Sequence, residues 1–244
     1  MADDDTYATH PRVLASARTS VAAQVILALI TSAAVFVPLK DKDGVVNEIG
    51  LLELGSQAIE LIFYLIVTFW VRAIYTWSRY LDWVISTPLM LLSLMAFFRH
   101  LEYEERTYLT DLFDESRLAS TLFVLGFNML MLVFGFLNEV RWMATVPSVS
   151  LGFVSFAASF GIMYVQHVRH GPLGGVLLWL FTYITWGLYG VFATLSPVPR
   201  NVGYNLIDLV SKNIFGLIIT VYALSIMGSS EAGSGEATSG SAYL

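Results

Sequence analysis

Residues 204–227 read YNLIDLVSKNIFGLIITVYALSIM, an apolar run with a single lysine, Lys212, near its middle. Asp208 lies four residues earlier, so both side chains share one face if this run is a helix. A lysine at the centre of a membrane helix costs about 2.5–3.5 kcal/mol on insertion scales. The run therefore predicts a membrane helix whose lysine has a use: a buried ion pair, an ion path, or an amine ready for a Schiff base.

The composition of the chain is that of an integral membrane protein. Of its 244 residues, 56% are hydrophobic and only 13% are charged, whereas soluble domains average about 25% charged residues. The net charge of −6 is concentrated in loops and termini and offers no basic surface for nucleic acid. Because the chain has no cysteine, disulfides and thiol chemistry are excluded.

Hydropathy predicts an all-α membrane protein, a bundle of seven transmembrane helices. A bilayer core of about 30 Å needs about 20 apolar residues per helix. The segments that satisfy this are residues 12–37, 48–71, 76–98, 117–137, 142–166, 173–195 and 203–227. They form one domain over residues 1–228, and the Gly/Ser/Ala-rich residues 229–244 are predicted to be a disordered tail. The Lys and Arg residues of the loops favour a multi-pass protein of the cell membrane with its N-terminus outside.

Four ionisable residues are expected to meet inside this bundle. Arg79 and Asp82 lie one turn apart on the third helix, and Asp208 and Lys212 lie one turn apart on the seventh. Since an unpaired buried charge is costly, Lys212 needs an acid beside it, and Arg79 could bridge both acids. Structural ion pairing alone is one reading of such a cluster, and a functional site is the other.

The second helix carries a polar stripe. Glu53, Gln57, Glu60 and Tyr64 recur at helical spacing, with Glu60 about 10 Å beyond Glu53 at 1.5 Å per residue. Three interpretations remain open: hydrogen-bonded structural acids, a proton path, or a hydrated pore, because acid-lined stripes select cations.

Three further motifs surround the cluster. Trp83, Trp186 and Tyr189 lie at mid-helix depth, where they form either aromatic core packing or an apolar box for a flat conjugated ligand. The third-helix segment 79–92 (RYLDWVISTPLMLL) resembles the R-Y-x-D-W-x-x-T-T-P-L-x-L-L signature of the microbial (type 1), bacteriorhodopsin-like rhodopsins. The segment 208–212 (DLVSK) resembles that family's D-x-x-x-K retinal attachment motif, and 186–189 (WGLY) is similar to its retinal wall.

This resemblance, which covers all seven helices, implies a cofactor and a set of site residues. It implies all-trans retinal bound to Lys212 as a Schiff base, with Asp82 as primary counterion and proton acceptor. Asp208 would be the second counterion, and Arg79 would organise water between the two acids. The residues that would line the retinal are Trp83, Thr87, Met131, Gly135, Trp186 and Tyr189. Many relatives form trimers or pentamers, so a homo-oligomer in the lipid bilayer is expected.

Some positions depart from the family pattern. Ser86 keeps a hydroxyl where a threonine is usual, and Ser93 stands where pumps often carry a carboxylic proton donor. A serine cannot supply a proton near neutral pH, so reprotonation from the inside should be slow or rerouted. The loop before the seventh helix offers Arg200 and no glutamate, so a carboxylate release pair is not evident.

The resemblance leaves the kind of transport open. Residues 57–64 (QAIELIFY) and 204–208 (YNLID) are similar to viral rhodopsins and their relatives, a group with both cation channels and proton pumps. We therefore expect a light-driven outward proton pump with Asp82 as acceptor and Glu53 or Glu60 as candidates for the proton path. A light-gated cation channel and a sensory photoreceptor are the alternatives. Neither an enzyme nor a metal site is predicted.

Overall fold

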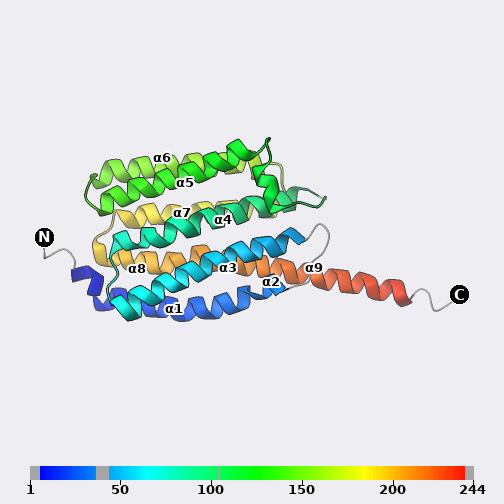
Figure 1. Ribbon diagram of the computed structural model, residues 1–244, viewed down its shortest axis with the longest axis horizontal. Helices are drawn as coiled ribbons and strands as arrows, with labels where there is room; N and C mark the ends of the chain where they lie inside the picture. The colour runs from blue at the N-terminus through cyan, green and yellow to red at the C-terminus, as the bar shows by residue number, and fades with distance from the viewer. Residues whose placement is uncertain (1–5, 37–43, 104, 240–244) are drawn as a thin grey trace.

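The computed structural model describes residues 6–36, 44–103 and 105–239, and within these it consists of helices and their connections. Seven spans are long and apolar enough to cross a membrane. Figure 1 shows them side by side in one bundle, with the two chain termini at opposite ends. The predicted seven-helix architecture is confirmed.

The elements follow one another along the chain with short connections. In order they are η1 (Thr6–Thr9), α1 (Pro11–Thr31), α2 (Ala33–Phe36), α3 (Gly44–Leu65), η3 (Ile66–Val71), η4 (Thr76–Ser78), α4 (Arg79–Glu102), η5 (Leu109–Phe113), α5 (Leu118–Glu139), α6 (Thr145–Met163), η6 (Tyr164–Val168), α7 (Leu173–Ala193), α8 (Pro197–Asp208), η7 (Leu209–Asn213) and α9 (Ile214–Ser239). Three of the short elements, η3, η6 and η7, are π-helical turns within or at the end of a span. Such turns are frequent at functional sites, and η7 contains Lys212.

The seventh span begins earlier than the sequence predicts. Residues 196–203 were expected to be a loop, but α8 starts at Pro197. Proline is well tolerated in the first turn of a helix, where its missing N–H would have no intrahelical partner. The correction brings Asn201 onto the helix that carries Asn205 and Asp208. At the other end, α9 is helical to Ser239, eleven residues into the stretch expected to be disordered. Extending an existing helix costs far less than starting one.

Helix α4 is the centre of the bundle. In the span that contains α4, 67% of an 18-residue apolar stretch is buried inside the protein, against 22% to 44% of the corresponding stretch in the other six spans. Pro88 lies within α4 without ending it. Because α4 carries Arg79, Asp82 and Ser93, its central position puts these polar residues deep inside the protein.

The surface is apolar and the interior is partly polar, which is the reverse of a soluble domain. Large apolar side chains such as Leu29, Trp70 and Val146 are exposed, whereas Arg79 and Lys212 are almost completely buried. This arrangement suits a lipid environment, since intramembrane charges face the bundle interior. The protein is therefore an integral multi-pass membrane protein.

Candidate functional site

Lys212 forms a buried ion pair with Asp82. Its Nζ atom lies 2.5 Å from Asp82 Oδ2, and the two side chains are 2% and 1% exposed. Lys212 comes from the π-helical turn η7 and Asp82 from the first turns of α4. Such a pair is taken out of water at a high desolvation cost, which is offset only by close geometry.

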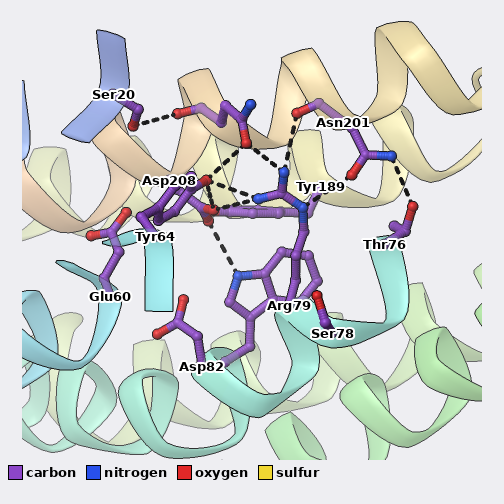
Figure 2. A network of polar contacts seen from close by, with 12 residues as sticks. Ser20, Glu60, Tyr64, Thr76, Ser78, Arg79, Asp82, Tyr189, Asn201 and Asp208 are labelled. Carbon is purple, nitrogen blue, oxygen red and sulfur yellow. Dashed lines mark hydrogen bonds and ion pairs between the residues drawn. The ribbon is translucent and has the colours of Figure 1, made fainter. Parts of the chain in front are cut away.

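Asp208 forms a second buried ion pair, with Arg79. Arg79 Nη1 lies 3.2 Å from Asp208 Oδ2, and the hydroxyl of Tyr64 donates to the same oxygen at 2.7 Å. The other oxygen accepts from Trp83 Nε1 at 3.2 Å and from the hydroxyl of Tyr189 at 2.6 Å. Figure 2 shows these donors converging on Asp208 from several helices. Four hydrogen bonds hold this carboxylate in place.

The two cations thus divide the two acids between them, and the ion pair of Arg79 is with Asp208. Besides Asp208, it donates to Tyr64 at 2.8 Å, to Asn201 Oδ1 at 3.2 Å and to the side chain of Asn205. Helical side chains lean toward the N-terminus of their own helix. The guanidinium group therefore points away from Asp82, which lies one turn further along α4.

We expect the Arg79→Gln substitution to lower the free energy of unfolding by about 3–5 kcal/mol, because it leaves Asp208 as an uncompensated buried charge. Thermal or denaturant unfolding of the purified protein measures this loss. Arg99→Gln is the matched control, because its ion pair with Asp111 at 3.1 Å is partly exposed, with side chains 13% and 18% accessible. That change should cost about 1 kcal/mol or less. Equal losses in the two variants would contradict the assignment.

An aromatic cavity begins at Lys212 and runs between α4, α5, α6 and α7. Its lining includes every residue that the resemblance assigned to retinal: Trp83, Thr87, Met131, Gly135, Trp186, Tyr189 and Lys212. Trp83 packs edge-to-face on Tyr189, with ring centroids 5.2 Å apart. An apolar cavity lined by an amine that is paired with a carboxylate fits a conjugated aldehyde such as retinal.

The acids of the second helix are buried and face other polar side chains. Ser93 of α4 donates a short hydrogen bond to Glu53 Oε1, so a carboxyl group does lie beside the serine that replaces the usual donor. Glu60 accepts from Gln24 of α1 at 3.0 Å. Ser86 is fully buried one turn beyond Asp82.

The structure adds polar residues that the sequence analysis missed. Asn201 links Arg79 to Thr76, whose hydroxyl accepts from Asn201 Nδ2 at 2.8 Å. Asn201, Asn205 and Asp208 lie on one helical face, a pattern visible only once the seventh helix is extended back to Pro197. Arg200 has a glutamate partner from another helix: Glu139, at the end of α5, lies 2.8 Å from its Nη1 atom.

The structure is thus a seven-helix membrane bundle in which a buried lysine–carboxylate pair lies beside an aromatic cavity. The chain belongs to the bacteriorhodopsin-like protein family, whose model matches residues 15–226. Members of this family bind retinal through a lysine Schiff base. No curated protein matches the chain.

Solved structures agree with this assignment. The viral rhodopsin OLPVRII is 27% identical, with a TM-score of 0.76, and the match covers 88% of this chain and 98% of that one. The blue light-absorbing proteorhodopsin from Med12 is 18% identical, with a TM-score of 0.66 and coverage of 87% and 97%. The proton pumping rhodopsin AR2 from the marine alga Acetabularia acetabulum is also 18% identical, with a TM-score of 0.67 and coverage of 90% and 97%. The last two show likeness of fold alone.

Proposed function

We propose that the protein is a light-driven outward proton pump that carries all-trans retinal on Lys212. We further propose that it forms homo-oligomers and that its N-terminus lies outside the cell. The observation that carries this proposal is the 2.5 Å contact between Lys212 Nζ and Asp82 Oδ2. When bound, retinal supplies light absorption and an isomerisation that changes the position and proton affinity of the lysine nitrogen. Asp82 is the acid placed to accept a proton from that nitrogen. The transfer neutralises both members of a buried pair.

An outer half of the path is supported by contacts that run from Arg79 toward the end of the bundle that holds Pro11 and Pro197. Arg79 contacts Asn201, and Asn201 contacts Thr76. Thr76 lines a polar cavity whose other walls include Glu139 and Arg200. Once Asp82 is neutral, the nearby cation of Arg79 favours the return of Asp82 to its charged form, and hence release of its proton toward this cavity.

An inner half of the path is supported by Glu53. It is 2% exposed, and its hydrogen-bond partner is the hydroxyl of Ser93. A buried carboxyl group without a cation partner is held in its neutral form. Glu53 therefore carries a proton at the place where Ser93 cannot, and we assign it as the donor that resupplies Lys212 from the inside.

We expect Glu53→Gln to slow recovery of the dark state by about 10²-fold, because positioned acid groups contribute about 10²–10⁴-fold to proton transfer. Flash photolysis of the pigment measures the recovery rate. Glu48→Gln is the control and should recover at the normal rate. Glu48 lies on the same helix and accepts a hydrogen bond from the backbone N–H of Leu109. A recovery rate in Glu53→Gln equal to that of the control would remove Glu53 from the path.

One observation favours a light-gated cation channel as the second candidate. Buried polar atoms along the stripe between α1, α3 and η7 have no hydrogen-bond partner among the described residues; they include Glu53 Oε2, Gln57 Nε2, Glu60 Oε2 and both side-chain polar atoms of Asn213. Groups of this kind are normally satisfied by internal water. A continuous hydrated stripe lined by acids would conduct cations.

Illumination under voltage clamp at two external pH values separates the two candidates. A pump gives current of one direction at all moderate voltages, and replacing external sodium leaves that current unchanged. A current that reverses near the cation equilibrium potential would contradict the pump and support the channel. Glu60→Gln adds a second criterion, because removing the mid-stripe acid should alter cation selectivity in a channel.

A further inference from the structure

The cavity that ends at Lys212 has one wall that faces lipid. All residues that line it belong to the described part of the chain. Among them, only Phe153 of α6 is exposed, with 37% of its surface accessible. Gly152 precedes it in the lining, and Gly190 of α7 lies opposite. The seam between α6 and α7 is therefore where the cavity comes closest to the bilayer.

The ring of Phe153 closes this seam by covering Gly190. A Cβ atom added to Gly190 would lie 2.5 Å from the ring, so the ring rests directly on the α7 backbone. Gly187 and Ala193, one turn to either side on α7, also line the cavity and present little side chain. A single aromatic side chain thus fills a gap that α7 leaves open.

The other ends of the cavity suit the passage of an apolar ligand less well. Toward the end of the bundle that holds Pro197, the lining reaches Asn138 and Glu139, which also line the polar cavity beside Arg200. On the opposite side, Trp186 packs on Phe160 with ring centroids 5.5 Å apart, and both rings are buried. Opening the Phe153 seam needs only a rotamer change of a partly exposed side chain, a motion of picoseconds to nanoseconds for exposed residues.

We propose that the Phe153–Gly190 seam is the lateral entrance through which retinal passes from the bilayer to Lys212. The inference rests on the proposal that Lys212 binds retinal. Retinal is an apolar aldehyde that partitions into lipid, so an entrance on the lipid face avoids transfer through water. On arrival, its aldehyde carbon bonds to Nζ and the carbonyl oxygen leaves as water.

The test measures the rate of pigment formation. The full chain is made without retinal, reconstituted in phospholipid vesicles, and mixed with vesicles that contain all-trans retinal; growth of the visible band is followed at each variant's own maximum. Phe153→Ala should form pigment about fivefold faster than wild type, equivalent to about 1 kcal/mol on the barrier. Leu151→Ala, equally exposed at 41% on the same helix but outside the cavity lining, should leave the rate unchanged.

Gly190→Ala provides a second, independent variant. Its added methyl group overlaps the Phe153 ring and should displace it, so uptake should accelerate in the wild-type background. In the Phe153→Ala background the same change should have no effect, because the ring is gone. If the variants instead loosened the fold in general, their two effects would be additive, and that result would overturn the proposal. Unchanged rates of pigment formation at equal final yield would also overturn it. If wild type forms no visible band at all, retinal binding itself fails, which is a distinguishable result.

Discussion

The Lys212→Ala substitution should abolish the visible absorption band of the protein after addition of retinal. Lys212 is the amine at the end of the aromatic cavity, and its Nζ atom is already paired with the acid that would stabilise a positive charge on it. Without that amine, no covalent link can form, and retinal would absorb as the free aldehyde. An absorption spectrum of the purified variant, recorded with and without retinal, measures the effect.

The chain supplies its own control for this experiment. The sequence contains two other lysines, Lys40 and Lys42, in the polar stretch 38–47, and both lie outside the described residues. The double change of Lys40 and Lys42 to alanine removes the same chemical groups and should leave the visible band intact. A normal band in Lys212→Ala, or its loss in the double control, would refute the link to Lys212.

The Asp82→Asn substitution should shift absorption to the red and reduce outward proton transport by about 10²-fold or more. The red shift follows because loss of the counter-charge lowers the cost of moving positive charge away from the lysine nitrogen and along the polyene. Transport falls because an amide at this position cannot accept the proton. An absorption spectrum of the variant measures the red shift. Light-induced acidification of the medium around cells that express the variant measures the loss of transport.

Asp208→Asn is the comparison variant for this prediction. Asp208 accepts four hydrogen bonds and pairs with Arg79 rather than with Lys212. Its replacement should therefore disturb the stability of the folded protein more than the absorption maximum. If Asp82→Asn leaves the spectrum unchanged and Asp208→Asn shifts it, Asp208 is the main counterion and the proposed transfer to Asp82 is wrong.

Local sequence pattern predicted the membrane spans well, and the family resemblance named residues that line one cavity. Trp83 and Thr87 are four residues apart on α4, and Trp186 and Tyr189 are three apart on α7, so each pair shares one helical face. The family resemblance named them, and the structure places them in the same cavity wall. The start of the seventh helix was wrong because two prolines resemble a loop, although proline is also favoured in a first helical turn.

Contacts between distant segments were not accessible to the same reasoning. Glu139 ends α5 and Arg200 lies in the first turns of α8, and no local pattern connects them. The same holds for Glu53 and Ser93, which lie on different helices and meet only after α3 packs on α4. Their pairing is nevertheless what makes Glu53 a candidate for the proton donor.

By itself, the sequence determined that this is a seven-helix membrane protein with a lysine, two acids and an arginine in its interior, because hydropathy and helical periodicity are properties of short segments. Only the tertiary structure decided which acid belongs to which cation: Lys212 pairs with Asp82, and Arg79 with Asp208. The partners are 130 and 129 residues apart in the chain. Which of two nearby acids each cation reaches depends on how α4 and the seventh span pack and on the direction in which each side chain leans.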